Sequence, residues 1–511
     1  MRGPLTDICE QPNVSDGRVL FDLIHPRPSP GLVCPEDQLA LSHEDIASVV
    51  ADLAGRLRSA GVERGDRVAL VLPNGPEVVL CLFAIALLGA AAAPLNPEYT
   101  EAEYRFYLAD LAPRFAIAGS EPPAGLLAAV DDLPVIEAPA ARPDARPALF
   151  LDGRELPPAP SFERGQSDDP ALLLHTSGTT SRPKQVPLLQ RNLTAQAASI
   201  ATHYALSEHD VSFCAMPLFH VHGLVASTLA QLSAGGTVVV PRRLVPGRFW
   251  AQAREHDMTW YSASPTPHQK LVARLDEPPS TLRFVRSCSS ALTPEMMRDV
   301  EARLGVPMVE AYGMTEATHQ MTSNPLPPAE RRAGSVGVSA GAEVRVVDDS
   351  GRDVLSGAPG EVAIRGPGLT PGYLANEKAN AESFFDGWFR TGDIGVLHGG
   401  YLRLQGRRKE MINRGGENIS PHEVEAVLSS HPLVAEAVAF SVPDAKYGER
   451  VAAAVVLGGE VSPEELRRHA RESLAAFKVP DAIYPVPEIP RTPTGKVQRS
   501  RMAAHLQITG R

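Results

Sequence analysis

Apolar and polar positions along the first 150 residues alternate between helical and strand spacing. Residues 44–60 carry apolar side chains at the spacing of an amphipathic helix, and residues 67–72 form a short apolar run typical of a buried strand. A buried helix is expected over 77–89, and a second strand over 90–95. Strands separated by helices indicate βαβ units, which build a largely parallel sheet.

The same alternation returns between residues 186 and 331 and predicts a second subdomain of this kind. Its strands are expected at 237–240, 259–262 and 284–288. The segment from 138 to 169, ahead of this subdomain, is rich in proline and charge, so it is expected to be a connector or surface loop.

Beyond residue 334 the pattern changes to short β-type runs separated by glycine turns, which predict a small barrel or antiparallel sheet. The last hundred residues form another unit of mixed helices and strands. We therefore expect an α/β protein with a large N-terminal domain (1–406) of βαβ subdomains plus a small barrel. A small, mobile α+β C-terminal domain (407–511) is expected to follow it.

Composition narrows the functional class. The chain has 511 residues and a net charge of −11, which argues against a nucleic-acid partner because such a partner requires a basic face. Its five cysteines are scattered without a C-x-x-C pair, which fits a reducing compartment and argues against a disulfide frame or a zinc site. No apolar run reaches the length of a membrane helix, and no signal pattern opens the chain. A cytoplasmic protein without a membrane partner is expected.

Residues 174–184 (LHTSGTTSRPK) stand out because five hydroxyl residues and a glycine crowd between an apolar run and a Pro-Lys pair. Backbone N–H groups, hydroxyls and one cation can together wrap a polyphosphate. The spacing of a Walker A loop is absent. The candidate phosphate-binding residues are Thr176, Ser177, Gly178, Thr179, Thr180 and Lys184.

Four further segments follow this loop in order. They are EAYGMTE (310–316), WFRTGD (388–393) with GRRK (406–409), NRGGENISP (413–421) and RTPTGKV (491–497). Each has an ordinary structural explanation when taken alone, such as a capped helix start or a basic surface turn. Together they resemble the motifs of adenylate-forming enzymes, the superfamily of acyl-CoA ligases, luciferases and adenylation domains.

The resemblance implies nucleotide-binding roles for EAYGMTE. Ala311, Tyr312 and Gly313 would line the adenine site, with the aromatic ring stacked on the base. Thr315 would reach phosphate, and Glu316 would hold Mg²⁺, a hard cation that prefers carboxylate oxygen.

The later segments would complete the site. Asp393 and Arg407 would bind the ribose, and Lys409 would be the hinge between the domains. Gly415 and Gly416 would line the pantetheine tunnel, where a backbone without side chains allows close approach.

Lys496 would deliver the cation for adenylation. The implied reaction uses ATP, Mg²⁺ and CoA. A carboxylate attacks the α-phosphate to give acyl-AMP and pyrophosphate, the small domain pivots, and CoA displaces AMP.

The segment PLFHVHG (217–223) resembles the pocket motif of acyl-CoA ligases, in which His220 would flank the activated carboxylate. Amino-acid adenylation domains usually carry an aspartate nearby to bind the substrate's ammonium, and none stands near His220. The runs 310–324, 175–184 and 284–290 resemble the oxalate–CoA ligase branch. A small diacid needs donors or cations at the end of its pocket. His222, Ser289 and His319 could supply them, and Arg286 is a weaker candidate because strand alternation can turn it away.

Two departures keep alternatives open. Gln185 replaces the glycine that usually follows the loop lysine, and Gly313 stands where similar enzymes often carry alanine, which would widen the space beside the adenylate. The acceptor could therefore be an amine or another group instead of CoA, and the acid a fatty or aryl acid. A non-catalytic binding protein of the same fold is a third reading, which the full motif set disfavours.

Overall fold

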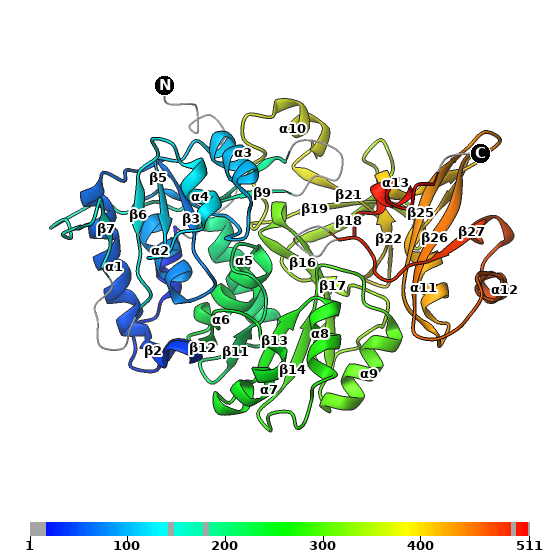
Figure 1. Cartoon of the computed structure of the whole chain (residues 1–511), viewed down its shortest axis with the longest axis horizontal. Helices are drawn as coiled ribbons and strands as arrows, with labels where there is room; N and C mark the ends of the chain where they lie inside the picture. The colour runs from blue at the N-terminus through cyan, green and yellow to red at the C-terminus, as the bar shows by residue number, and fades with distance from the viewer. Residues whose placement is uncertain (1–16, 142–147, 177–182, 492–496, 509–511) are drawn as a thin grey trace.

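An eight-stranded sheet forms the first subdomain, on the left of Figure 1, in the order β10-β9-β4-β3-β5-β6-β7-β8. The computed structural model describes residues 17–141, 148–176, 183–491 and 497–508. Strands β9, β4, β3, β5 and β6 run parallel, as the βαβ pattern predicts. The strands are β3 (Arg67–Val71), β4 (Ala91–Pro94), β5 (Phe115–Ala118), β6 (Val135–Glu137), β7 (Phe150–Leu151), β8 (Arg154–Glu155), β9 (Pro170–His175) and β10 (Gln185–Leu189). The helices are α1 (His43–Ala60), α2 (Pro76–Leu87), α3 (Glu101–Leu111) and α4 (Ala124–Ala129).

A nine-stranded sheet follows, in the order β17-β16-β15-β14-β13-β11-β12-β1-β2, with a parallel centre and antiparallel edges. Its strands are β1 (Pro30–Cys34), β2 (Leu39–Ser42), β11 (Val211–Cys214), β12 (Thr237–Val239), β13 (Trp260–Ala263), β14 (Phe284–Ser287), β15 (Met308–Met314), β16 (His319–Ser323) and β17 (Val338–Ser339). Its helices are α5 (Gln190–His203), the π-helix η3 (His222–Leu229), α6 (Ala230–Ser233), α7 (Pro246–Glu255), α8 (Pro265–Val272) and α9 (Pro294–Leu304).

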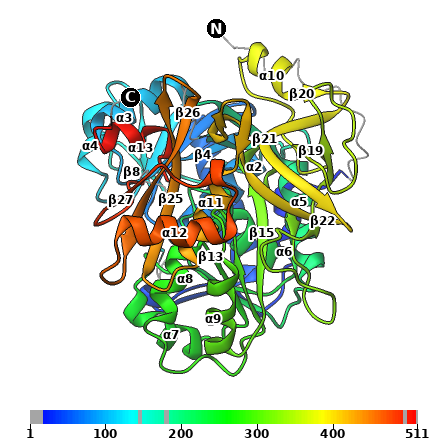
Figure 2. The ribbon, with the colours of Figure 1, turned by 90° about the vertical axis from the view of Figure 1, so that its right-hand side faces the viewer.

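Two smaller sheets make up the rest of the described chain. The third is antiparallel, as expected for the segment after residue 334, and consists of β18 (Glu343–Val347), β19 (Pro359–Arg365), β20 (Phe384–Phe385), β21 (Trp388–His398) and β22 (Tyr401–Arg407), with α10 (Glu377–Ser383) beside it. The fourth, at the right of Figure 1 and facing the viewer in Figure 2, consists of β23 (Ile412–Arg414), β24 (Glu417–Ile419), β25 (Val434–Asp444), β26 (Gly448–Leu457) and β27 (Ala482–Pro485). Its helices are α11 (Pro421–Ser429), α12 (Pro463–Ser473) and α13 (Met502–His505).

Local signals set the element ends. Ser42 caps α1 by accepting a hydrogen bond from the backbone N–H of Asp45 at 3.0 Å, and Gly61 ends the helix with φ +98°. Only glycine adopts that conformation without strain, so the helix ends there. The apolar helix α2 is buried on every side, as its composition predicts. The strand–helix alternation therefore predicted these elements to within one or two residues.

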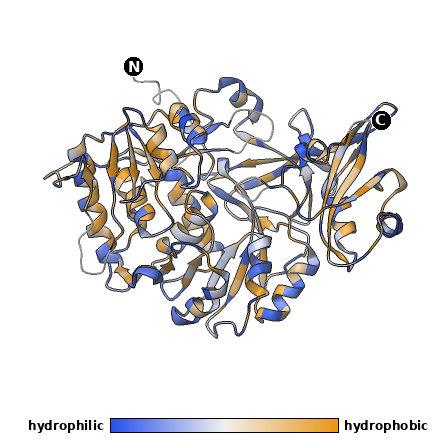
Figure 3. Ribbon diagram, viewed as in Figure 1, coloured by the Kyte–Doolittle hydropathy of each residue, from blue (hydrophilic) through white to orange (hydrophobic). Residues whose placement is uncertain are grey.

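The largest hydrophobic core lies between the two large sheets. It joins residues of the first sheet such as Leu70, residues of the second such as Trp260 and Phe284, and residues 78–87 of α2. In Figure 3 the strands and inward helix faces are orange and the outer helix faces are blue. Within the described ranges, every helix is too short or too polar to span a bilayer. The predicted fold class is confirmed.

The third and fourth sheets meet at one turn of 3-10 helix, Arg408–Glu410, which carries Lys409 on the surface. Ser420, at the start of α11, donates to the backbone oxygen of Gln405. The domain division at residues 406/407 and the hinge role of Lys409 stay predictions, and this turn is where they place the pivot.

Candidate active site

Two distant strands bring the predicted adenine and ribose residues together. The hydroxyl of Tyr312, in β15, donates to Oδ2 of Asp393 in β21. The Nε of Arg407, at the end of β22, lies 3.2 Å from Oδ1 of the same carboxylate. Asp393 is buried, and burial raises its pKa while Arg407 opposes the shift. The carboxylate is therefore fixed from both sides, and Ala311 lies buried next to Tyr312.

The described ends of the polar loop belong to β9 and β10, which pair antiparallel. The backbone N–H of Thr176 donates to the carbonyl oxygen of Lys184 at 2.9 Å, so the two ends of the loop are joined. The side-chain amide of Gln185 donates to the backbone oxygen of Asp110 at 2.6 Å and to its carboxylate at 2.7 Å, and Nε2 of His175 lies 3.0 Å from the same carboxylate. Gln185 thus anchors the foot of the loop to α3, a contact that glycine could not make.

Five of the predicted site residues lie outside the described part of the chain. They are Ser177, Gly178, Thr179, Thr180 and Lys496.

Glu316 and Lys184 meet at a tyrosine that sequence reasoning missed. The hydroxyl of Tyr373 donates to Oε1 of Glu316 at 2.8 Å, and the ammonium of Lys184 lies 4.2 Å from the centre of its ring. Burial, followed by the charge of Glu316, raises the pKa of Tyr373, so the hydroxyl keeps its proton. Thr315 opens the one-turn helix Thr315–Ala317 beside them. No local pattern marks Tyr373, because its partners are distant in the chain.

The donor set suits a magnesium ion shared with nucleotide phosphate. Glu316 is a buried carboxylate with an ordered partner. No group of three or more His, Cys, Asp or Glu that could cage a metal occurs among the residues that the structure describes. Mg²⁺ commonly binds through one or two carboxylates plus substrate phosphates, so Glu316 fits it.

The predicted acid-pocket residues form one cluster, in which His222 and His319 are buried and Ser289 lies at the exposed edge. His222, the first residue of the π-helix η3, has Nδ1 at 2.9 Å from the hydroxyl of Ser289 and Nε2 at 2.7 Å from that of Ser262. The ring of His319 lies 5.1 Å from the ring of His222. π-Helical turns occur often at functional sites. Ser262, which the sequence analysis did not single out, completes the cluster.

Arg286 belongs to this cluster, so its demotion on grounds of strand alternation was wrong. Alternation places Arg286 on the same face of β14 as Phe284, and the core that Phe284 joins includes residues of η3. Its guanidinium donates to Ser262 Oγ at 2.9 Å, and one of its N–H groups lies 3.5 Å from Nε2 of His222. The sequence predicted the alternation but not which face holds the site.

The hydrogen bonds define a direction. A guanidinium can only donate, so Ser262 Oγ accepts a hydrogen bond from Arg286. The hydroxyl of Ser262 then donates its hydrogen to Nε2 of His222. We therefore assign the ring proton of His222 to Nδ1, from which it donates to Ser289 Oγ. The Ser289 hydroxyl is left free to donate outward. We call this chain of Arg286, Ser262, His222 and Ser289 the polar relay.

The electrostatics of the cluster favour an anion. Arg286 is fully buried, and in the described part of the chain it has no carboxylate partner; its remaining bonds go to Tyr204 and Gln320. Burial, followed by the charge of Arg286, holds the pKa of His222 and His319 well below the usual range, so both rings are neutral.

Unsatisfied and strained groups gather at the same place. The Nε2 atom of His319 is buried and has no hydrogen-bond partner among the residues that the structure describes. His319 and Ser289 have φ of +134° and +74°, which non-glycine residues rarely adopt. Such strain concentrates at functional sites.

Gly313 does not widen the pocket, contrary to the expectation. A Cβ there would lie 2.0 Å from the carbonyl oxygen of His319. The absent side chain is replaced by the backbone of β16, which pairs with β15 at this point. Gly313 therefore brings His319 close to the nucleotide motif.

The remaining predicted residues have clear positions. His220 lies just before η3, with its ring 4.6 Å from that of Phe219. Gly415 and Gly416 form the turn between β23 and β24 with φ of +64° and +94°, where glycine is favoured. The backbone N–H of Gly415 donates to the carbonyl oxygen of Tyr447 at 2.8 Å.

Comparison with known proteins agrees with this geometry. Residues 26–374 match the family model described as AMP-binding enzyme, and residues 423–496 match that of the AMP-binding enzyme C-terminal domain. A probable CoA ligase of Humulus lupulus is 44% identical over 487 residues, which cover 91% of each chain. An oxalate–CoA ligase of Arabidopsis thaliana is 43% identical over 479 residues, covering 91% of this chain and 93% of that protein.

Among solved structures, the O-succinylbenzoate coenzyme A synthetase of Bacillus subtilis in complex with ATP and magnesium ion is similar, with a TM-score of 0.84. It is 28% identical, and the match covers 95% of this chain and 99% of that one. These matches confirm the resemblance carried by the five motifs. The chain therefore belongs to the AMP-binding enzyme family, as an ATP-dependent, AMP-forming ligase in the oxalate–CoA ligase branch of the adenylate-forming superfamily.

Proposed function

We propose that this ligase activates oxalate, or another small acid with a second anionic group, and transfers it to CoA. The observation that carries the proposal is Arg286, a buried cation without a carboxylate partner among the described residues. Burying an unpaired charge is costly, so a substrate anion is its natural counter-ion. A fatty or aryl acid would bring only apolar surface to this end of the pocket.

The polar relay would hold the second carboxylate of the substrate. Arg286 polarises Ser262 and His222, and the hydroxyl of Ser289 donates at the end of the relay. Beside the relay, Nε2 of His319 has no hydrogen-bond partner within the described ranges. A neutral relay backed by one buried cation stabilises an anion without placing a second charge in the pocket.

The first carboxylate would then face the α-phosphate. His220 flanks it, Tyr312 stacks on adenine, and Asp393 with Arg407 orients the ribose. A carboxylate oxygen bonds to the α-phosphorus while the bond to the bridging oxygen breaks and pyrophosphate leaves. Thr176, Lys184 and Lys496 stabilise the charge that develops there. A magnesium ion held by Glu316 would neutralise phosphate charge when bound.

The second half-reaction needs the thiol to reach the acyl carbon. The small domain would pivot at Lys409, which withdraws Lys496 and brings Gly415 and Gly416 to the tunnel. The sulfur bonds to the acyl carbon, its proton goes to solvent, and AMP leaves with the electrons of the acyl–oxygen bond.

The test is pyrophosphate release with oxalate, malonate, short and medium fatty acids and aromatic acids, each with and without CoA. Turnover confined to oxalate or a similarly small diacid, with thioester product only when CoA is present, is the expected outcome. Preference for a monocarboxylic acid would overturn the substrate assignment. Adenylate formation followed by transfer to an amine in preference to CoA would overturn the acceptor.

A further inference from the structure

The segment 370–374, here named the strap, ties together the two parts of the phosphate site. The backbone N–H of Thr370 donates to the carbonyl oxygen of Glu316 at 2.7 Å, and its hydroxyl donates to that of Pro187 in β10 at 2.6 Å. The N–H of Leu374 donates to the carbonyl oxygen of Gln185 at 3.0 Å. The strap is thus bonded both to the strand that closes the phosphate loop and to the residue expected to hold Mg²⁺.

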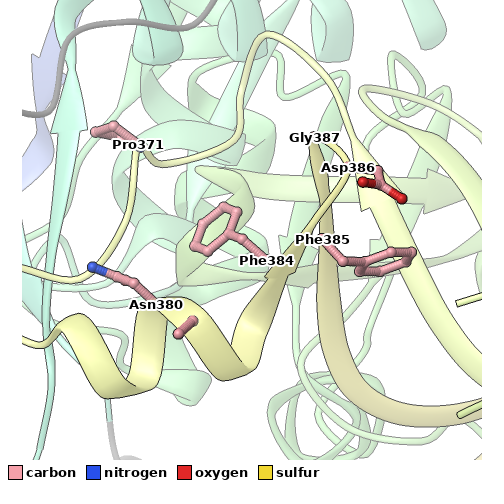
Figure 4. Close-up of a pocket in the computed structure, with 7 residues that line it drawn as sticks. Pro371, Asn380, Phe384, Phe385, Asp386 and Gly387 are labelled. Carbon is pink, nitrogen blue, oxygen red and sulfur yellow. The ribbon is translucent and has the colours of Figure 1, made fainter. Parts of the chain in front are cut away.

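One side chain fixes the strap from the other side. Asn380 in α10 accepts a hydrogen bond from the N–H of Tyr373 at 2.7 Å and donates to its carbonyl oxygen at 2.9 Å. Figure 4 shows Asn380 on this helix, with Pro371 on the incoming strap and Phe384 beyond. Because both backbone groups of Tyr373 are held, its side chain has a defined direction.

That side chain contacts two residues of opposite charge. The hydroxyl donates to Glu316 at 2.8 Å, and the ring lies 4.2 Å from the ammonium of Lys184. Tyr373 is only 4% exposed, so water competes little with either contact. The hydroxyl of Tyr373 thus contacts one of the two carboxylate oxygens of Glu316. The ring face holds the ammonium of Lys184 by a contact that can persist while the same ammonium binds a phosphate.

We infer that Tyr373 is a positioning residue for the nucleotide: it orients Glu316 toward Mg²⁺ through its hydroxyl and holds Lys184 at the phosphate site through its ring. The inference rests on the roles assigned to Glu316 and Lys184, and it is independent of which acid is activated. Hydrogen-bond partners of metal ligands typically change metal affinity or activity by about 10–100-fold when removed.

The experiment is calorimetric binding of α,β-methylene-ATP, an analogue that cannot donate its adenylyl group because a methylene replaces the oxygen between the α- and β-phosphorus, at a series of Mg²⁺ concentrations. Tyr373→Phe removes only the hydroxyl. We expect its Mg²⁺ requirement to rise about tenfold or more, with little change in analogue affinity when Mg²⁺ is absent. Tyr373→Leu also removes the ring, so analogue affinity without Mg²⁺ should fall as well, by about threefold or more for the loss of a cation–π contact.

A double variant separates positioning from general stability. If Tyr373 acts through Glu316, then Tyr373→Phe combined with Glu316→Gln should need no more Mg²⁺ than Glu316→Gln alone. Additive effects would overturn the inference. The matched control is Tyr401→Phe. The hydroxyl of Tyr401 also donates a hydrogen bond, here to the backbone oxygen of Glu330 at 2.6 Å, and the guanidinium of Arg332 lies 3.9 Å from its ring centre. Tyr401→Phe should leave Mg²⁺ dependence unchanged.

The variants distinguish a wrong metal assignment for Glu316 from a wrong role for Tyr373. If Glu316→Gln itself leaves the Mg²⁺ dependence intact, the metal assignment is wrong. If Glu316→Gln weakens it but Tyr373→Phe does not, the role of Tyr373 alone is refuted. Thioester formation from synthetic acyl-AMP should be normal in Tyr373→Phe, because that half-reaction needs no polyphosphate, and its loss would indicate a misfolded site.

Discussion

Replacement of Arg286 by methionine separates binding from stability, because this cation has no carboxylate partner in the described chain. Methionine fills a similar volume without charge. The change removes the cation that begins the polar relay and leaves its other three members, Ser262, His222 and Ser289, in place. If a substrate carboxylate is the counter-ion, its binding should suffer much more than folding.

The magnitudes follow from the contacts. A hydrogen bond to a charged group contributes about 1.5–3 kcal/mol, so kcat/KM for oxalate should fall roughly 10- to 100-fold. In the unliganded protein the bonds that Arg286 donates to Ser262, Tyr204 and Gln320 are lost, at about 1.5–3 kcal/mol each because the donor is charged. Relief of a buried, unpaired cation offsets this by several kcal/mol. The two contributions are of similar size and opposite sign, so the unfolding free energy should change little.

Arg283→Met is the matched control. Arg283 lies just before β14, is 39% exposed in its side chain and pairs with Asp210, which is buried. Its loss leaves a buried carboxylate without its cation, at a cost of about 1–2 kcal/mol after allowance for solvent screening. It should lower the melting temperature without changing KM for oxalate. We therefore expect Arg286→Met to weaken oxalate binding with little change in stability, and Arg283→Met to lower stability without changing oxalate binding.

The assays are pyrophosphate release with oxalate and thermal melting with and without oxalate. Oxalate should stabilise the parent protein and Arg283→Met, but not Arg286→Met. An unchanged KM for oxalate in Arg286→Met, or a loss of stability as large as that in Arg283→Met, would refute the reasoning and make Arg286 a structural residue.

Three further predictions concern other parts of the chain. Lys496→Ala should lower adenylate formation by on the order of 10²–10³-fold while thioester formation from synthetic acyl-AMP persists; equal loss in both half-reactions contradicts the assigned division of roles. Lys409→Pro should slow the thioester step with unchanged ATP affinity, measured by comparing the two half-reactions, and weakened ATP binding alone would contradict the hinge. Burial raises the pKa of Glu310 to about 8 from 4.5, so the folded protein keeps a proton that the unfolded chain releases. Stability should therefore fall as pH rises from 4.5 to 8, and Glu310→Gln should flatten that slope in denaturant titrations; an equal slope in both proteins would contradict the burial argument.

Much of the fold follows from local sequence. The alternation of apolar runs predicts the βαβ subdomains, and caps such as Ser42 and Gly61 place the helix ends, because these signals act between neighbours in the chain. The motif types predict nucleotide chemistry for the same reason: a carboxylate, a glycine turn or a hydroxyl-rich loop has its chemical properties wherever the chain places it. Whether Lys409 is the hinge and Lys496 the adenylation lysine stays a prediction.

Other features depended on packing between distant segments. The period of β14 places Arg286 and Phe284 on one face, but only the packing of the core shows that this face lies toward η3 and His222. The missing side chain of Gly313 predicts open space when only the sequence is considered. In the folded protein the backbone of His319, in the neighbouring strand β16, fills that space.

The sequence by itself determined the element pattern, the superfamily and the chemical types at the site. The tertiary structure decided that Arg286 has no carboxylate partner among the described residues, and that Tyr373 joins Glu316 to Lys184. Residue types and their spacing are local properties of a chain. Which side chains share a dry interior is settled only when sheets and loops far apart in sequence pack together, because burial and counter-ions are properties of that packing.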